Sequence, residues 1–296
     1  MTNSLTVLQL IEDAAAQLEA AGLSLANGFG QGTLNAFDEA AWLVLWRLGL
    51  PLNNLDLVSN RSVTEENRAQ VASLLGARIM TRQPLAYLTN EAWLQGVPFY
   101  VDKRVVIPRS FIAELIVDES IDLWLSESTH SVLDLCTGNG SLAVLAAMAW
   151  PDVVIHAADI SADALAVARI NIDKHDLNKR IKLFESDGLA ACKGPYDLIL
   201  CNPPYVNSST MAALPAEFKA EPALALASGE DGMDFIRSLF LNAAGHMSEN
   251  AVLVLEIGNE RENFERAFPL LKPLWFETSG GPDQVLLLTR QQLLYT

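Results

Sequence analysis

Apolar residues recur at helical spacing near the start of the chain, at positions 5, 8, 11, 15 and 18. This spacing predicts a helix from Leu5 to Leu23, and a second helix is predicted over Phe37–Leu48. Ser62 and Glu65 have the spacing of a capping box, so a third helix is predicted over Val63–Arg82. We therefore expect residues 1–90 to form a small helical domain.

Short extended segments follow the helices. Two apolar segments flank Gln95-Gly96 and predict a β-hairpin within Ala92–Val101. Ser110 is expected to cap a helix that runs to about Leu125. We take residues 91–109 as a hairpin linker.

Apolar strands alternate with helices from residue 131 onward. The helices are expected at about 141–149, 162–174 and 232–244, and the strands at Val132–Leu135, Val153–Ala158, Ile181–Glu185, Leu198–Cys201 and Ala251–Glu256. This alternation predicts an α/β fold with a doubly wound parallel sheet. Leu274–Glu277 and Val285–Thr289 are expected to close the sheet as an antiparallel hairpin. Residues 110–296 should thus form one domain.

The composition excludes several classes of protein. Half of the 296 residues are hydrophobic and 19% are charged, which is enough for a substantial core. No apolar run reaches the roughly 18 residues that a membrane helix needs, and the first ten residues lack the basic start of a signal peptide. Three cysteines without Cys-x-x-Cys spacing and four scattered histidines indicate neither a disulfide framework nor a metal site. We expect a cytoplasmic protein with no membrane contact.

The formal charge of −16 is distributed unevenly. Residues 61–110 carry seven basic and four acidic side chains, a balance of +3, whereas residues 1–60 balance to −5 and residues 111–296 to −14. Such an acidic chain is poorly suited to grip bare DNA and would favour encounter with a basic macromolecule. By itself, the charge is also explained by solubility.

A stiff turn follows one of the predicted strands. Tyr196–Cys201 is an apolar run, and the two prolines after it end the strand because proline cannot continue the hydrogen-bond ladder. The turn Asn202-Pro203-Pro204-Tyr205 therefore lies at the carboxyl end of a strand, where open α/β sheets bind ligands. An isolated turn of this kind would only end the strand, so its function depends on its surroundings.

A glycine-containing loop, Asp134–Gly140, leaves the first strand of the sheet and enters a helix. Gly138 and Gly140 allow the backbone to approach a ligand closely and to direct free amide groups at it. With Ala143 the loop also matches the G-x-G-x-x-A pattern of dinucleotide-binding folds, which is a rival interpretation.

Aspartates near the ends of three successive strands favour a different ligand. Asp134 can hold an ammonium group, for which a dinucleotide gives no reason, and Asp159 can accept from both ribose hydroxyls, as in either kind of site. Asp187 can accept from an adenine amino group, with the amide of Gly188 nearby. Each aspartate alone would be explained as a turn or helix cap. Together they indicate S-adenosylmethionine, held by these residues with Thr137, Gly138, Gly140 and Asn202.

The proline turn offers two fixed hydrogen-bond acceptors. The side-chain carbonyl of Asn202 and the backbone carbonyl of Pro203 can take both hydrogens of one NH₂ group. They would aim a nitrogen whose lone pair is delocalised and favour its pyramidal, positively charged transition state. Tyr205 can stack on a flat substrate or face a sulfonium cation. In-line methyl transfer then needs no strong general base, and positioning supplies most of the rate.

These motifs resemble those of the class I S-adenosylmethionine-dependent methyltransferases that carry Asn-Pro-Pro-Tyr, and among them the HemK family of protein-glutamine methyltransferases. The resemblance covers nearly the whole chain, including Ile107-Pro108-Arg109, Asp134–Gly140, Asn202–Tyr205 and Glu221–Leu226. It implies a Rossmann-like catalytic domain and a helical N-terminal domain that recognises the substrate. It also implies catalytic roles for Asn202, Pro203 and Tyr205, which bind substrate together with Pro204 and Arg109. Cys136 stands where many methyltransferases have glycine, and Gly188 where relatives often have a bulkier residue.

Two branches of this family differ after Arg109. The release-factor branch usually has Ile-Pro-Arg-Pro and then an acid, whereas this chain has Ser110-Phe111-Ile112. Ala86–Trp93 and Phe99–Asp102 are similar to the branch that methylates a glutamine in the third protein of the large ribosomal subunit. The resemblance implies that protein, or a ribosome precursor, as partner. The +3 segment would then lie near ribosomal RNA in a precursor.

Three alternatives stay open from the sequence. Release-factor methylation differs only in the partner. DNA adenine methylation could use the same turn, but the chain is acidic and has no inserted basic target-recognition domain. A non-catalytic nucleotide-binding protein could keep the fold without the reaction.

Overall fold

The computed structural model describes residues 5–294. These residues form two compact units. The first extends to Glu91 and includes the distant segment Leu214–Ala220, and the second comprises Ala92–Ala213 and the chain from Glu221 onward. The chain therefore leaves the second unit after Ala213 and re-enters it seven residues later. The division into 1–90, 91–109 and 110–296 stays a prediction.

The first unit is helical, as predicted. Its principal helices pack around an apolar core that includes Ile11, Leu18, Leu43 and Leu75, and they are α1 (Val7–Ala20), α2 (Ala36–Arg47), α3 (Glu65–Thr81) and α4 (Leu85–Thr89). The short α4 was not predicted. The expected capping box at Ser62 is wrong, because Ser62 pairs with Thr6 in an isolated β-bridge and the helix begins later. Thr64 caps α3 instead, and its hydroxyl accepts from the amide of Asn67 at 3.2 Å.

A buried ionic cluster holds Leu214–Ala220 in this unit. The guanidinium of Arg78 is fully buried and binds Glu39 at 2.7 Å and Glu217 at 3.0 Å. Arg78 also donates to the carbonyl of Gly28 at 2.6 Å, and the side chain of Gln31 donates to the carbonyl of Glu217 at 3.2 Å. Glu217 lies on the short helix α9 (Ala216–Lys219), which the sequence did not predict.

The predicted hairpin is confirmed at the start of the second unit. Strands β1 (Ala92–Leu94) and β2 (Val97–Phe99) pair antiparallel. Gln95 and Gly96 both have positive φ, 49° and 76°, as a two-residue hairpin turn requires. The helix predicted from Ser110 to Leu125 is too long. Helix α5 covers only Ile112–Val117, because Glu119 adopts a left-handed conformation with φ of 64°.

The main sheet of the second unit has seven strands in the order β5-β4-β3-β6-β7-β9-β8. The first five are parallel and the last two antiparallel, which confirms the doubly wound sheet and its closing hairpin. The strands are β3 (Ser131–Leu135), β4 (Val154–Asp159), β5 (Ile181–Glu185), β6 (Tyr196–Cys201), β7 (Met247–Glu256), β8 (Leu274–Thr278) and β9 (Gly281–Thr289).

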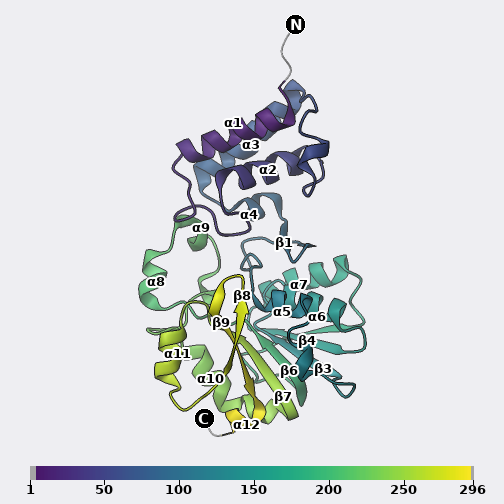
Figure 1. The fold of residues 1–296 in the computed structure, drawn as a ribbon, viewed down its shortest axis with the longest axis vertical. Coiled ribbons are helices and arrows are strands. Elements are labelled where there is room, and N and C mark those ends of the chain that lie inside the picture. Colours follow the sequence, from purple (N-terminus) through teal and green to yellow (C-terminus); the bar gives the residue numbers. More distant parts are fainter. Residues whose placement is uncertain (1–4, 295–296) are drawn as a thin grey trace. The chain divides into compact units, whose positions relative to one another are not determined.

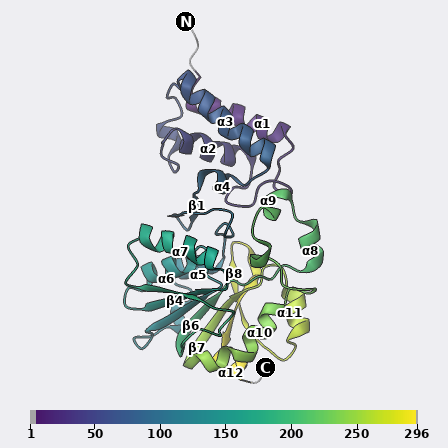
Figure 2. The same cartoon turned by 180° about the vertical axis from the view of Figure 1, so that it is seen from behind.

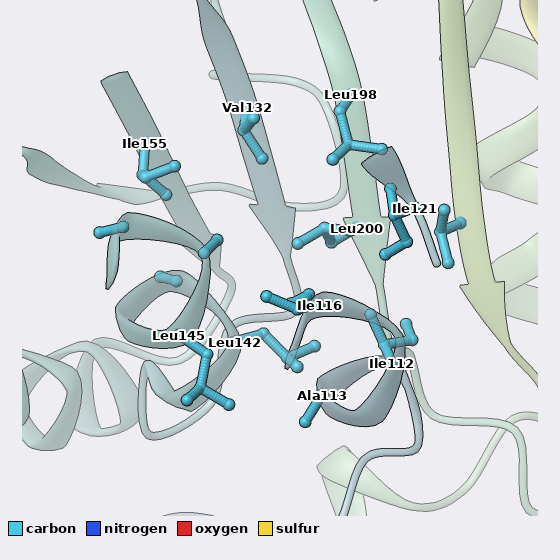
Figure 3. Close-up of a cluster of buried hydrophobic side chains, with 14 of the residues drawn as sticks. Ile112, Ala113, Ile116, Ile121, Val132, Leu142, Leu145, Ile155, Leu198 and Leu200 are labelled. Carbon is cyan, nitrogen blue, oxygen red and sulfur yellow. The ribbon is translucent and has the colours of Figure 1, made fainter. Parts of the chain in front are cut away.

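Helices cover both faces of this sheet, because its strands carry apolar side chains on both sides. Successive residues such as Val132 and Leu133 face different core clusters. Figure 3 shows one of these clusters, in which Ile116 and Leu142 pack against Val132, Leu198 and Leu200. That face is covered by α5, α6 (Ser141–Ala149) and α7 (Ala162–Lys174). The other is covered by α10 (Asp234–Ala243), α11 (Arg261–Ala267) and α12 (Arg290–Leu293).

The strand order reverses direction between β3 and β6. From β3 the chain proceeds outward to β4 and β5, then crosses back to place β6 on the other side of β3. Loops leaving β3 and β6 therefore diverge, and a crevice at such a switch point is where doubly wound sheets bind ligands. Both motifs singled out from the sequence leave these two strands. Among residues 5–294, no helix is both long and apolar enough to span a membrane.

Candidate functional site

The glycine loop turns sharply between β3 and α6. Cys136, Gly138 and Gly140 all have positive φ, of 61°, 55° and 80°. Cys136 thus holds a backbone conformation that glycine adopts at lower cost. A Cβ on Gly138 would meet no atom within 4 Å, so the backbone here faces open space.

Asp134 lies beneath this loop and is 1% exposed. Its Oδ2 accepts from the hydroxyl of Thr137 and from the amide of Ala143 at 3.0 Å. Its Oδ1 has no hydrogen-bond partner in the described part of the chain, and neither has the buried Nδ2 of Asn139. Burial raises the pKa of Asp134 to about 7. The loop therefore carries a buried acceptor and a buried donor that are unsatisfied.

Asp159 ends β4 next to the same loop. Its Oδ2 accepts from the amide of Gly138 and its Oδ1 from the amide of Ser161, both at 2.9 Å. Burial raises the pKa of this carboxyl as well. Because each carboxylate oxygen can accept more than one hydrogen bond, Asp159 supports the loop and keeps capacity to accept from a ligand.

Asp187 and Gly188 follow β5 at the same edge of the sheet. The side chain of Asp187 is exposed, and a Cβ on Gly188 would meet no atom within 4 Å. The hydroxyl of Ser186 donates to the carbonyl of Gly188 at 2.7 Å and holds this turn. The structure thus brings the three aspartates to the ends of three neighbouring parallel strands.

Asn202 and Pro203 leave β6 beside the glycine loop, since Cys201 pairs with Leu135 of β3. Asn202 is half-buried and Pro203 is buried. Within residues 5–294, the side-chain amide of Asn202 and the carbonyl of Pro203 have no hydrogen-bond partner. The two acceptors expected from the sequence are therefore available.

Tyr205, by contrast, is held firmly by its neighbours. Its hydroxyl donates to Glu256 at 3.3 Å. Burial, reinforced by the charge of Glu256, raises the pKa of Tyr205 well above its ordinary value. A Cβ on Gly258 would collide with the ring, so one side of the ring packs against that backbone.

Arg109 forms a bidentate ion pair with Glu221, at 2.6 and 2.7 Å. The carboxylate of Glu221 also accepts from the amide of Ile107 at 3.0 Å. The pair fixes Ile107–Arg109 to the chain that follows the proline turn. This geometry supports a positioning role for Arg109.

Comparison with known proteins identifies the family. The model of the Methyltransferase small domain matches residues 116–249. A ribosomal protein uL3 glutamine methyltransferase of Bordetella pertussis is 47% identical over 97% of this chain and 96% of its own length. Proteins of the same name are 45% identical in Neisseria gonorrhoeae, over 98% of this chain and 96% of their chain, and 44% in Burkholderia pseudomallei, over 97% and 95%. The chain belongs to this family of methyltransferases.

Solved structures agree on the fold. The hMettl16 catalytic domain, crystallised in complex with MAT2A 3′UTR hairpin 6, superposes with a TM-score of 0.51 and 13% identity. The match covers 78% of this chain and 84% of that one. At this identity the likeness shows the class I methyltransferase fold alone, as the sequence predicted.

Three acidic residues at the site were missed by the sequence reasoning. Glu221 holds Arg109, and Glu256 holds Tyr205. Glu260 accepts from Asn207, just beyond the proline turn, at 2.6 Å. A carboxylate closing the apolar run Ala251–Glu256 was the available signal for Glu256. Glu221 lies in the stretch Glu221–Leu226 that the resemblance covers, but its pairing with Arg109 was not predicted, and no pattern indicated Glu260.

The basic excess of residues 61–110 is largely neutralised. Five of the seven basic side chains form ion pairs, namely Arg68 with Glu65, Arg78 with Glu39 and Glu217, Arg82 with Glu217, Arg104 with Asp102, and Arg109 with Glu221. Arg61 and Lys103 are exposed and form no ion pair within the described chain. Contact of this segment with ribosomal RNA stays a prediction.

Proposed function

We propose that this protein transfers a methyl group from S-adenosylmethionine to the side-chain amide nitrogen of a glutamine in ribosomal protein uL3. The observation that carries the proposal is the pair of unpartnered acceptors on Asn202 and Pro203, beside the glycine loop. An amide NH₂ group has two hydrogens to donate and matches that pair. The names of relatives at 44–47% identity support uL3 as the protein that carries the glutamine.

The residues around the glycine loop fit the cofactor. Asp134 keeps an unpaired buried oxygen suited to an ammonium group, and Asp159 keeps capacity for ribose hydroxyls. Asp187 is exposed and free to accept from an adenine amino group. Space around Gly138 and Gly188 allows close approach, so we assign the cofactor to these residues with Thr137, Gly140 and Asn202. When bound, S-adenosylmethionine supplies an electrophilic methyl group on a sulfonium centre.

The proline turn acts by orienting the substrate amide. Asn202 and Pro203 accept both amide hydrogens and direct the nitrogen lone pair, which resonance otherwise withdraws into the carbonyl. As the nitrogen becomes pyramidal and positively charged, the two acceptors stabilise its N–H groups more strongly than in the ground state. Tyr205 stacks on the flat amide, and Pro204 contributes to the same substrate-binding turn. The proton then leaves to solvent, so no side chain has to act as a strong base.

Recognition of the whole substrate is assigned to other parts of the chain. We attribute it to the helical domain 1–90 and the linker 91–109, with Arg109 positioning the linker at the catalytic domain 110–296. A net charge of −16 suits a basic ribosomal protein, either free or in a ribosome precursor. We place the reaction in the cytoplasm, where ribosomes assemble.

A methyl-transfer assay tests the proposal directly. Radiolabelled S-adenosylmethionine is offered with uL3, a release factor or DNA in separate reactions, and mass spectrometry of the digest locates the added methyl group. We expect label on a glutamine of uL3. Label on the release factor alone, or on DNA, would refute the assigned substrate, and no label on any would refute the activity.

Asn202→Ala tests the assigned mechanism. Loss of one oriented acceptor should lower kcat by roughly a hundredfold or more, the scale seen when one preorganised hydrogen-bonding group of an active site is removed. Calorimetry should show that S-adenosylmethionine still binds. Asn250→Ala, at an exposed asparagine within β7, is the matched control for loss of an asparagine side chain. Full activity of Asn202→Ala would exclude the paired-acceptor mechanism.

A further inference from the structure

Glu256 is a buried charge beside the reacting turn that the mechanism has not used. It closes β7, is 2% exposed, and follows Leu255, which pairs with Cys201 immediately before Asn202. Its carboxylate accepts three hydrogen bonds, from the hydroxyl of Ser110 at 2.6 Å, the amide of Phe111 at 2.9 Å and the hydroxyl of Tyr205 at 3.3 Å. These donors come from two segments on either side of β7.

We propose that Glu256 is a positioning residue for methyl transfer, which fixes the ring of Tyr205 at the substrate amide through the tyrosine hydroxyl. The inference rests on the function proposed above, because it concerns the same turn. It adds a residue to which neither the motif nor the relatives' names assign a role. Glu256 itself need not touch substrate or cofactor.

Tyr205 has two close backbone contacts, at Gly232 and Gly258, and its hydroxyl makes the side-chain contact that a substitution can change. A Cβ on Gly232 would collide with the carbonyl oxygen of Tyr205, and a Cβ on Gly258 with its ring. Both glycines have positive φ, 78° and 53°, so their own conformations also resist replacement. Two close backbone contacts thus hold the tyrosine at its carbonyl and at the edge of its ring, and the bond to Glu256 fixes the direction in which the long axis of the ring points.

A carboxylate is suited to this place where an amide is not. An ionised carboxylate only accepts hydrogen bonds, and all three neighbours of Glu256 donate. In Glu256→Gln, an NH₂ group that faces Ser110 and Phe111 would leave the amide of Phe111 without an acceptor, and one that faces Tyr205 would force the tyrosine hydroxyl to turn round and accept instead of donate. Burial raises the pKa of Glu256, and the hydrogen bonds from Ser110, Phe111 and Tyr205 oppose this rise by favouring the ionised carboxylate.

The same carboxylate joins Tyr205 to the segment that precedes α5. Ser110 and Phe111 directly follow Arg109, which Glu221 holds by its bidentate pair. Two acids therefore fix residues 107–111, Glu221 at the start and Glu256 at the end. Through Glu256, the placement of this segment is coupled to the placement of the catalytic tyrosine.

A double-mutant cycle tests the role. Glu256→Gln, Tyr205→Phe and the double variant are assayed for methylation of uL3, and Glu262→Gln, an exposed acid on α11, is the matched control. Glu256→Gln should lower kcat by roughly tenfold to a hundredfold, the equivalent of one hydrogen bond to a charged group, with KM for uL3 changed less than about twofold. The double variant should be no slower than the slower single variant, because both remove the same bond.

Two results would overturn the proposal. One is that the effects of Glu256→Gln and Tyr205→Phe on kcat multiply in the double variant. The other is that Glu256→Gln changes KM alone. If Glu256→Gln fails to fold, Ser110→Ala removes only one of the three donors and takes its place. Ser110→Ala should lower kcat severalfold in the Tyr205 background and leave Tyr205→Phe unaffected.

A readout independent of activity separates this proposal from the function. In protein labelled at the Cζ carbon of its five tyrosines, the signal that disappears in Tyr205→Phe is assigned to Tyr205. That signal should shift in Glu256→Gln and stay in place in Glu262→Gln. An unshifted signal refutes the bond itself. If wild-type protein methylates none of the substrates offered, the proposed function fails, whether or not the signal shifts.

Discussion

At the scale of single residues, the site contains buried polar groups that the protein does not satisfy itself. Asp134 keeps one unpaired oxygen at 1% exposure, and Asn202 and Pro203 keep unpaired acceptors at the end of β6. An unsatisfied buried polar group costs stability, so proteins keep few of them. Gln31 and Trp42 of the helical unit also keep one unpaired buried atom each, so the assignment to ligands rests on the place of Asp134, Asn202 and Pro203 at the switch point of the sheet.

Asp134 should make stability fall as the pH rises. Its folded-state pKa, about 7, is above the ordinary value of 3.8, so the folded protein holds this proton more tightly than the unfolded chain. The stability it contributes is fully present below the unfolded pKa and is lost as the pH rises through the folded one. In urea unfolding of the unliganded protein, the free energy of unfolding of wild type should fall by up to about 4 kcal/mol more than that of Asp134→Asn between about pH 4 and pH 8.

Asp152→Asn, an exposed aspartate, serves as the control and should leave the pH dependence of wild type unchanged. If the free energy of unfolding of wild type changes with pH in the same way as that of Asp134→Asn across this range, ionising Asp134 costs the folded protein no stability.

At the scale of elements, α3 and α9 are joined by charge rather than by apolar contact alone. Arg78 of α3 is fully buried between Glu39 of α2 and Glu217 of α9. A buried ion pair adds little net stability when intact, but removing one partner leaves an uncompensated charge. The cluster thus determines which segment can occupy this place in the helical unit.

Arg78→Met should destabilise the protein by about 3–5 kcal/mol, because Glu39 loses its guanidinium partner in the core. Arg68→Met on the same helix breaks an exposed pair with Glu65 and should cost less than about 1 kcal/mol. Chemical denaturation of both variants gives the comparison. Equal effects would mean that the buried cluster is no more important than a surface pair.

At the scale of the whole molecule, the net charge favours encounter with a basic partner. The chain carries 36 acidic and 20 basic side chains. Five of the seven basic residues in 61–110 are already paired with acids. Long-range attraction of a basic protein needs only the net charge, whereas binding to RNA needs free cations.

Methylation of purified uL3 should therefore slow as salt is added. We expect kcat/KM to fall by roughly tenfold between low and moderate ionic strength, since screening shortens the reach of electrostatic attraction. A short uncharged peptide that contains the target glutamine is the control and should respond little. If uL3 and the peptide respond alike, electrostatic steering does not contribute.

The sequence by itself determined the elements whose causes are local. Period-3.6 and continuous apolar runs predicted the three long helices of the first unit and the parallel sheet of the second, because burial of side chains dictates both patterns. The prolines that follow Cys201 and the glycines that follow Asp134 marked the two loops proposed to form the site, since backbone conformation there depends on the residue itself. The family resemblance then named the reaction and its substrate.

Only the tertiary structure decided which distant groups meet. Glu217 belongs to the helical unit although it lies beyond the catalytic turn, and Glu256 binds Ser110 across 146 positions of sequence. Ser62 failed as a cap because Thr6 pairs with it, and helix α5 ended early at Glu119. Long-range pairing of charges and hydroxyls leaves no periodic signal along the chain. The sequence thus identified the turn Asn202–Tyr205 that we propose holds the amide, and the fold revealed the buried acids Glu221 and Glu256 near it.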